Sequence, residues 1–577
     1  MLEIRNLVFA VVLSVLIMMG WRLVYEKFFT VQHIVEDEDS SSMIPEIDNV
    51  LTYRSRNEII DSTPNLRVKL SNKEISGSIS LKGAQLDDLV FKNYHVTPDN
   101  SSDGIILLSP ENTEGVYFIE FGWIDPQHKI VVPNQLSTWT SDKSVLSPNN
   151  TVTLTWDNQQ GVIFQIKVTL DDYYMFKIEQ IIINNTDNIV NLIPYGRINR
   201  ARHTTEKSYW ISHEGAVGSF GYTLKEWTYK NIIKERNIKI SQQNTDDNQW
   251  VGIADKYWFT ALIPNILQKK SKLSFHVKHG KYNNEDRFQV DFSHDNYSAY
   301  PNKTASSTSY LFAGAKELKL LDKYKKDLNI SLFDKAVDFG ILYFITKPVF
   351  LLLEYFYDLI GNFGLAILLL TIVIKLIMFP LSYKSYVSMF KLKYLQPEIL
   401  KIKELYKNDN TKMSKEVSLL FKKNDVSPMS GFIPILIQIP VFFALYKVLF
   451  VTIEMRHAPF YLWVKDLSNF DTANVLTLFG LLNFNPPICI GILPVILGIT
   501  MIIQQKMNTS THSSQDQDKI QASFIKFLPY VFIFIFSSFP TGLIIYWICS
   551  NSITIIQQLI IKAYIGRKFN LKHDYNN

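Results

Sequence analysis

Long apolar runs constrain the fold of this chain more than any other feature of its sequence. A helix needs about 20 apolar residues, with a range of roughly 17 to 25, to cross a lipid bilayer. Six runs are near that length, the fourth and fifth being short: Leu7–Val24, Phe363–Leu381, Gly431–Phe450, Pro487–Ile503, Phe524–Phe539 and Gly542–Ile561. The 577 residues are therefore predicted to form a soluble half and a helical membrane half.

The first run resembles a secretory signal in its position, but its length argues against removal. The apolar stretch is long for a signal, and the residues that follow, MMGWRLVYEKFF, contain no pair of small residues at cleavage spacing. We interpret residues 1–29 as an N-terminal transmembrane anchor that stays attached.

The distribution of lysine and arginine predicts the orientation in the membrane. Short loops rich in these residues remain in the cytoplasm. Residues 382–430 and the tail 562–577 are rich in them, whereas the loop 451–486 contains Arg456 and Lys465 alone. With six spans, both termini are predicted to be cytoplasmic and residues 30–331 to lie in the periplasm of a double-membrane bacterium.

Residues 30–331 carry the period-2 alternation of half-buried strands. It recurs in TVTLTWDN (151–158), GVIFQIKVTLDD (161–172) and YYMFKIEQIIINN (173–185), and turn-forming clusters separate these segments. This pattern favours an antiparallel β-sandwich. The only cysteines, Cys489 and Cys549, lie in apolar runs, so the domain is expected to fold without a disulfide.

A catalytic interpretation of the sandwich has little support in the sequence. The HEG triplet at 213–215 is accompanied by no metal-binding spacing, nucleophile elbow or phosphate loop. We interpret His213 as an ordinary loop histidine and the domain as a binding or spacing module.

The segment 332–361 joins the two halves and is rich in both aromatic and charged side chains. A seventh span is one alternative, but charges recur at intervals from Asp334 to Asp358. We predict an amphipathic helix that lies in the outer membrane interface and ends at Gly361.

Lys375 lies deep inside the second span. A charge at the bilayer centre costs about 2.5 to 3.5 kcal/mol and usually faces a polar cavity or a partner. The lysine is six residues from the inner end of the span, but its Cα–Cβ bond tilts toward the helix N-terminus, away from the cytoplasm. No Asp or Glu lies inside the later spans, so an ion pair within the chain is not expected; Lys447 and Lys526 lie near span ends and are predicted to reach the headgroups.

Other polar side chains accompany Lys375 in the membrane half. Thr371 shares its helix face, Gln438 interrupts the third span, and the sixth span carries a stripe at intervals of three and four that begins beside Tyr546 and contains Trp547, Asn551, Thr554 and Gln558. Such residues commonly join helices in membranes. Together with an unpaired lysine they are also consistent with a water-filled groove.

Several long motifs resemble the YidC-type membrane protein insertases of Gram-negative bacteria. They include GNFGLAILLLTIVIKLIMFPL, PILIQIPVFFALY, APFYLWVKDLS and FPTGLIIYWICSNSITIIQQ, and VKLSNKEISGSISLKGAQLDDLVFKNY is similar to the start of that family's periplasmic β-sandwich. The resemblance covers essentially the whole chain. The family usually has arginine at the position of Lys375, so the charge is kept while the bidentate fork of arginine is lost.

The resemblance implies an inner-membrane insertase, not an enzyme and without a cofactor or small-molecule substrate. It would move hydrophobic segments of nascent membrane proteins into the lipid without nucleotide hydrolysis, alone or with the Sec translocon. The implied core, residues 362–577, has five helices around a hydrophilic groove, and its third and fifth spans form an apolar face for the client helix. By position, Thr371, Lys375, Tyr546 and Trp547 would line the groove or touch the client.

The cytoplasmic loop 382–430 is predicted to be a helical hairpin. Its helices are expected at Tyr386–Tyr406, with Pro397 inside, and at Thr411–Lys423. A solvated hairpin that only fixes topology is one interpretation. The resemblance adds contact with ribosomes, targeting factors or the Sec translocon through lysines that include Lys391, Lys393, Lys401, Lys403 and Lys407, a charge that also suits anionic lipid.

Three other classes of protein fit the sequence less well. A secondary transporter, our main alternative, normally carries intramembrane carboxylates or inverted repeats, and we find neither in the sequence. An intramembrane protease would need catalytic aspartates, a Ser/His pair or zinc ligands inside the spans, and no histidine or aspartate lies there. A simple anchor for the sandwich would need one span.

Overall fold

The computed structural model describes residues 53–99, 101–202, 212–241, 246–265, 273–282, 285–340, 342–427, 433–477, 489–508 and 527–574. The predicted first span, Leu7–Val24, and Lys526 lie outside these residues.

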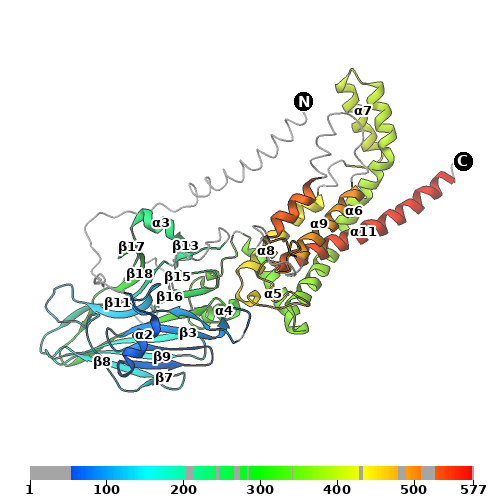
Figure 1. Cartoon of the computed structure of the whole chain (residues 1–577). Helices are drawn as coiled ribbons and strands as arrows, with labels where there is room; N and C mark the ends of the chain where they lie inside the picture. Colours follow the sequence, from blue (N-terminus) through cyan, green and yellow to red (C-terminus); the bar gives the residue numbers. More distant parts are fainter. Residues whose placement is uncertain are drawn as a thin grey trace. The chain divides into compact units, whose positions relative to one another are not determined.

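Two large sheets form the β-sandwich that the alternating pattern predicts (Figure 1). One follows the order β14-β17-β18-β11-β5-β3-β2-β1-β7, with β19 paired to β11 and β4 to β3; the other follows β13-β12-β15-β16-β20-β10-β9-β8-β6. Neighbouring strands are antiparallel, apart from the parallel pair β1 and β7. The antiparallel part of the prediction is thereby confirmed.

The strands of the first sheet are β1 (Arg67–Ser71), β2 (Ile75–Ser80), β3 (Gln85–His95), β4 (Gly104–Leu108), β5 (Tyr117–Ile124), β7 (Val145–Leu146), β11 (Val190–Ala201), β14 (Asn237–Ser241), β17 (Leu273–Tyr282), β18 (Glu285–His294) and β19 (Tyr297–Ala299). Those of the second are β6 (Thr140–Ser141), β8 (Val152–Asp157), β9 (Val162–Leu170), β10 (Met175–Asn184), β12 (Gly215–Phe220), β13 (Thr223–Thr228), β15 (Trp250–Ala254), β16 (Trp258–Pro264) and β20 (Lys303–Ala315). Helix α3 (Tyr229–Glu235) follows β13.

Strand β9 illustrates how the sequence builds the sandwich core. Its apolar side chains at every second position, from Val162 to Leu170, are buried, while the residues between them are more exposed. Phe164 lies opposite Ile182 of β10 in the antiparallel register. Because side chains alternate across a strand, this pattern buries one face of the strand against the other sheet.

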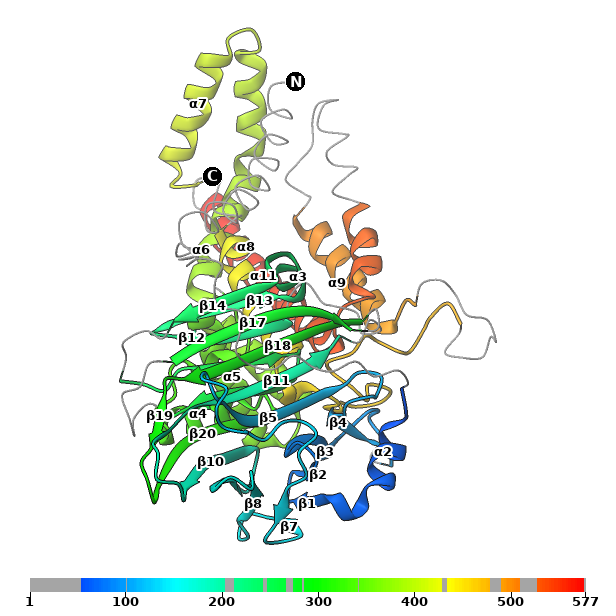
Figure 2. The same cartoon turned by 90° about the vertical axis from the view of Figure 1, so that its left-hand side faces the viewer.

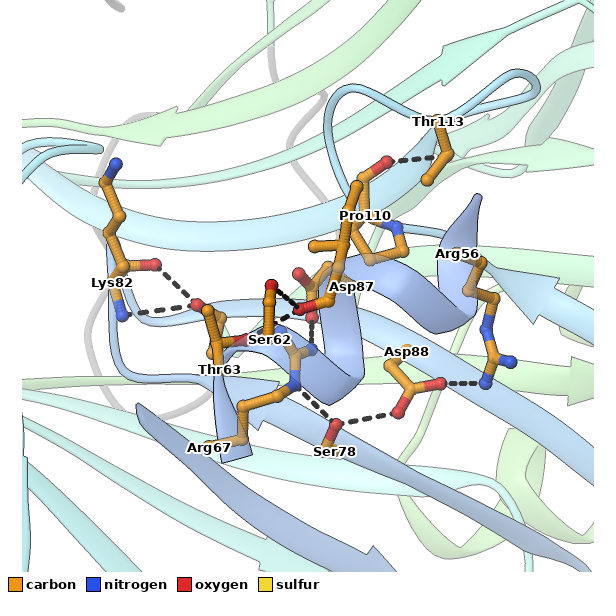
Figure 3. A network of polar contacts seen from close by, with 12 residues as sticks. Arg56, Ser62, Thr63, Arg67, Ser78, Lys82, Asp87, Asp88, Pro110 and Thr113 are labelled. Atoms are coloured by element: carbon orange, nitrogen blue, oxygen red, sulfur yellow. Dashed lines mark hydrogen bonds and ion pairs between the residues drawn. The ribbon is translucent and has the colours of Figure 1, made fainter. Parts of the chain in front are cut away.

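Two ion pairs fasten the segment before the first strand, and the first strand itself, onto β3 of the sandwich. Helix α2 (Arg56–Ser62) and the short η1 (Pro64–Leu66) precede β1. As Figure 3 shows, Arg56 pairs with Asp88 and Arg67 with Asp87, and Ser78 connects the two pairs. Ser78 accepts a hydrogen bond from Arg67 Nε at 2.7 Å and donates one to Asp88 at 2.7 Å.

The join between the halves is less regular than the single helix expected over residues 332–361. After α4 (Leu318–Asp327) come a short 3-10 turn η2 (Phe333–Ala336), an extended stretch, and then α5 (Tyr343–Ile360). The extended stretch turns the Asp338 side chain toward a lysine of another helix. Helix α5 ends at Gly361, as predicted from the sequence, and this glycine has the left-handed conformation common at helix ends.

The remaining helices form the C-terminal region in which the predicted spans lie. They are α6 (Phe363–Leu405), α7 (Asn410–Lys423), α8 (Ile433–Val451), the 3-10 turn η4 (Ile453–Met455), α9 (Ile492–Asn508), an apolar helix Phe527–Phe536, and α11 (Thr541–Asp574). By length and composition, α6 and the Thr541–Ile565 part of α11 could cross a membrane, while Gln438–Val451, Ile492–Met507 and Phe527–Phe536 are shorter apolar helices. The number of spans therefore stays a prediction.

Helix α6 continues through the expected boundary between the second span and the cytoplasmic hairpin. Its 43 residues include both Pro380 and Pro397, and its second half pairs with α7 in a hairpin (Figure 2). The change from apolar to charged residues after Leu381 does not end the helix, and no glycine follows there to end it.

Candidate functional site

Lys375 is held in the fourth turn of α6, whose start is well defined. The Asn362 side chain caps the helix by accepting a hydrogen bond from the Leu365 backbone N–H at 3.1 Å. Lys375 is half-buried, while its neighbours Leu376 and Ile377 are exposed. The lysine therefore lies on the edge of the helix face that packs against other helices.

Two neutral side chains from two other helices bind the lysine. Its ammonium donates to Thr554 Oγ1 of α11 at 3.0 Å and to Gln438 Oε1 of α8 at 3.5 Å. Among the residues that the structure describes, no carboxylate forms an ion pair with it. The dipoles of the Thr554 hydroxyl and the Gln438 amide orient the ammonium, but these neutral groups do not neutralise its charge.

Tyr546 and Tyr386 extend this arrangement. Gln438 Nε2 donates to the Tyr546 hydroxyl of α11. The buried Tyr386 side chain of α6 lies beside Gln558 and Thr554 of α11. We call Lys375, Gln438, Thr554, Tyr546 and Tyr386 the polar cluster. It joins α6, α8 and α11 around one cation.

Tyr386 was not among the residues predicted from the sequence, although a signal for it exists. It follows Lys375 by eleven residues, which is about three helical turns and places both residues on one face of a continuous helix. The expected helix boundary after Leu381 concealed this spacing.

The other residues predicted to line a groove lie elsewhere in the helix packing. Thr371 is buried and donates to the Ile367 carbonyl of its own helix at 2.7 Å. Asn551 donates to Thr500 of α9 at 3.1 Å, which joins two helices. Trp547 packs among aromatic rings, with the tilted Phe442 ring of α8 at a centroid distance of 4.7 Å.

Lys447 corrects our expectation that it reaches toward the headgroups. Its ammonium donates to Asp338 Oδ2 at 2.9 Å and to the Asp338 carbonyl at 3.2 Å. The same carboxylate accepts the His213 backbone N–H at 2.9 Å. The end of α8 is thus bound to the join and to the sandwich, and His213 belongs to this contact.

Burial and neighbouring charges shift the pKa values of the groups at this contact. Burial acts to raise the pKa of Asp338, but the attraction of Lys447 and the hydrogen bonds to the carboxylate outweigh it and lower the pKa. Burial lowers the pKa of Lys316 to about 8 and that of His213 to about 4. Within the described part of the chain the Lys316 ammonium, at 1% exposure for the residue, has no hydrogen-bond partner.

Most of the predicted recruitment lysines project from the hairpin of α6 and α7. Lys393, Lys401, Lys403 and Lys407 are exposed, whereas Lys391 donates to the Asn424 carbonyl at 3.4 Å and helps hold the two helices together. No group of three or more His, Cys, Asp or Glu side chains within the described ranges could hold a metal ion.

Glu454 of η4 is expected to make stability depend on pH. Burial, followed by the nearby Glu354 and Glu317 carboxylates, raises its pKa from 4.5 to about 8. The folded protein therefore retains a proton that the unfolded chain releases between these values, so stability falls as pH rises from about 4.5 to 8.

Glu454→Gln should remove this dependence, because the amide resembles the protonated acid. At pH 8 the variant should unfold a few degrees higher than the parent protein, since about 1 kcal/mol corresponds to about 2–4 °C in domains of 150–250 residues. Thermal unfolding of both proteins across this pH range tests the effect. A constant difference between the two melting temperatures would contradict it.

A β-sandwich followed by apolar helices, with a cation held by neutral partners among those helices, defines a two-part membrane protein. Family models match both parts: "YidC periplasmic domain" over residues 67–352 and "60Kd inner membrane protein" over residues 355–568. The chain belongs to the YidC family.

Curated relatives match nearly the full length of the chain. The membrane protein insertase YidC of Rickettsia typhi is 43% identical over 573 residues, which cover 97% of this chain and 99% of the relative. That of Rickettsia prowazekii is 43% identical over 567 residues, with the same coverage.

Solved structures of YidC proteins are also similar. An active YidC insertase with its first transmembrane domain resolved aligns over 94% of this chain and 98% of its own, at 16% identity and a TM-score of 0.35. YidC from Thermotoga maritima aligns over 85% of this chain and 98% of its own, at 12% identity and a TM-score of 0.29.

Proposed function

We propose that this chain is a membrane protein insertase of the inner membrane that moves hydrophobic segments of nascent proteins from the cytoplasm into the lipid. The observation that carries the proposal is the ammonium of Lys375, bound by Thr554 and Gln438 and by no carboxylate among the described residues. A cation without a counter-ion in an apolar region is available to an anion of a client.

Exposed apolar side chains on two of the C-terminal helices supply a surface for a client helix. Leu436, Ile439 and Phe443 are spaced along one side of α8, and Phe527, Tyr530 and Phe534 along the helix Phe527–Phe536. We infer that a polar flank enters at the cluster while the apolar segment moves along this surface into the lipid. Thr371, Trp547 and Asn551 then support the helices around the route.

The proposed reaction needs no nucleotide. An apolar side chain contributes about −0.3 to −0.6 kcal/mol at a helix centre, so about 15 of them favour insertion by several kcal/mol. The obstacle is the passage of the polar flank through hydrocarbon. A hydrated groove at the polar cluster shortens this passage, and the positive charge attracts acidic flanks.

The proposed topology keeps the predicted arrangement. Residues 1–29 are the N-terminal anchor, residues 30–331 the periplasmic domain, 332–361 an interfacial segment and 362–577 a five-helix core, with both termini in the cytoplasm. The exposed hairpin lysines suit recruitment of the ribosome, targeting factors or the Sec translocon through negatively charged surfaces. The short fourth and fifth spans would thin the bilayer locally.

Reconstitution tests the function directly. The purified full chain in liposomes should insert a small single-span client, without nucleotide, into a protease-protected position. Vesicles without the protein are the control. Failure to insert any client, together with a solute-dependent ion flux, would favour the transporter alternative.

Removal of the sandwich provides a further prediction. Deleting most of Asn65–Lys323 should leave insertion of a single-span client largely intact, because the polar cluster is made by α6, α8 and α11. The same liposome assay measures the effect, with circular dichroism to confirm that the helices are folded. Loss of all insertion by a folded deletion would assign a direct role to the sandwich.

A further inference from the structure

The segment between α8 and α9 ends in an exposed apolar tip. Leu462 is 87% exposed and Tyr461 is 56% exposed. Leu462 also has a φ of 62°, the left-handed region that side chains other than glycine and asparagine seldom adopt. Both the exposure and the backbone conformation are unfavourable for a leucine in water.

The surrounding contacts hold the tip in this conformation. The Phe460 backbone N–H donates to the Val464 carbonyl at 2.9 Å, which closes a turn around Tyr461 and Leu462. Trp463, the next residue, donates through its ring N–H to Asp471 at 2.9 Å. The turn therefore presents Leu462 outward, and none of these contacts covers it.

The tip adjoins the start of α6. The Phe460 ring lies against Gly364 in the first turn of that helix, so closely that a Cβ there would come within 1.9 Å of the ring. Phe363 of the same turn stacks on Tyr357 of α5 at a centroid distance of 3.7 Å. Through Phe460, the tip is thus next to the first turn of α6, which is the outer end of the second predicted span. That turn also contacts α5, a helix with the exposed apolar residues Tyr355 and Leu359.

We propose that the Tyr461–Leu462 tip inserts into the outer leaflet of the membrane, with Leu462 among the lipid acyl chains and Tyr461 at the headgroups. The proposal rests on the membrane placement given under the proposed function. The tip lies beside the outer end of a predicted span, so lipid is within its reach. Burial of Leu462 among acyl chains would remove the free-energy cost of exposing this side chain to water. A tyrosine suits the headgroup level because its ring is apolar and its hydroxyl polar.

A fluorescent probe at position 462 tests the proposal in the full chain. Since the protein has two cysteines, Leu462→Cys in a Cys489→Ala, Cys549→Ala background can be labelled uniquely with an environment-sensitive dye. The matched control is Leu136→Cys, an exposed leucine of the sandwich at 66% exposure. Both proteins are reconstituted in phosphatidylcholine vesicles that contain lipid with a doxyl quencher near the headgroup.

The lipid quencher should reduce the emission at 462 at least about twofold more than at 136, because interfacial apolar groups enter the boundary between headgroups and acyl chains. Aqueous iodide should quench the 136 probe alone. A 462 probe that behaves like the 136 probe would overturn the proposal. Tyr461→Cys, labelled in the same way, gives an independent measurement if the first variant folds poorly.

Two further outcomes separate this proposal from others. If lipid quenches the 462 probe but no client is inserted, the lipid contact of the tip is supported and the insertase function is contradicted. If clients are inserted but the 462 probe is exposed to water, the insertase function is supported and the lipid contact is contradicted. A probe exposed in pure lipid vesicles but shielded in native membranes would overturn the lipid contact and assign the tip to a protein partner.

Discussion

Lys375→Glu is expected to lower the insertion rate of clients with acidic translocated tails by at least about tenfold, which corresponds to about 1.4 kcal/mol in the barrier. The expectation follows from Coulomb's law, because two unit charges 4 Å apart interact by about 1 kcal/mol in water and about 4 kcal/mol near a protein surface. A glutamate would repel an acidic flank that the lysine attracts. Insertion into liposomes of paired clients that differ only in tail charge measures the effect.

Neutral-tailed clients should lose less activity, and Lys375→Arg should be tolerated because it keeps the charge. Lys506→Glu is a matched control, since it reverses an exposed lysine in the last turn of α9 outside the polar cluster. Equal defects for acidic and neutral clients in Lys375→Glu would contradict the role of the charge and favour a general loss of helix packing.

Lys375 could be identified from the sequence because its surroundings constrain it so strongly. A lysine in the middle of an apolar run needs polar partners, and the polar side chains inside the later apolar runs that were predicted as partners are uncharged. The sequence predicted Gln438, Thr554 and Tyr546 as members of the polar set, and all three lie in the cluster. It did not separate them from Asn551, which contacts α9, because the rotation of one helix against another is not encoded in a local pattern.

The partner of Lys447 could not be predicted in this way. Asp338 precedes it by 109 residues and lies in a segment that was expected to be helical. The pairing depends on the extended conformation of that segment, which tertiary contacts determine. The β-sandwich was predictable because alternation reports burial residue by residue, whereas the order of its strands depends on contacts between distant segments.

Lys447 and Lys375 are both cations in the predicted membrane half, but they have different kinds of partner. Lys447 is bound by a carboxylate of its own chain, which explains it as a structural contact between α8 and the join. Lys375 is bound by an amide and a hydroxyl. Because a fold can neutralise such a charge when structure alone requires it, the lack of a carboxylate around Lys375 in the described residues supports a role toward a client.

Asp338→Ala is expected to destabilise the protein by about 3 kcal/mol, the lower end of the range for a broken buried ion pair, because the partly buried Lys447 and the buried Lys316 both lose a carboxylate. The loss affects Lys447 and also Lys316, whose ammonium has no hydrogen-bond partner among the described residues and is attracted by the Asp338 carboxylate. Thermal unfolding of the purified full chain in detergent at pH 7 measures the difference. The lowered pKa of Asp338 means that its contribution is present above pH 3.8 and is lost as pH falls through the folded-state value.

Two control variants identify the cause of the Asp338 effect. Lys316→Met should be neutral or stabilising at pH 7, since it removes a buried cation that burial disfavours, and its advantage should fade between pH 8 and 10.5 as the folded protein and then the unfolded chain lose the proton. Lys447→Met should cost less than Asp338→Ala because it leaves Asp338 with the His213 N–H and Lys316 nearby. Equal losses from Asp338→Ala and Lys447→Met would show that one ion pair, rather than a carboxylate shared between two lysines, stabilises the join.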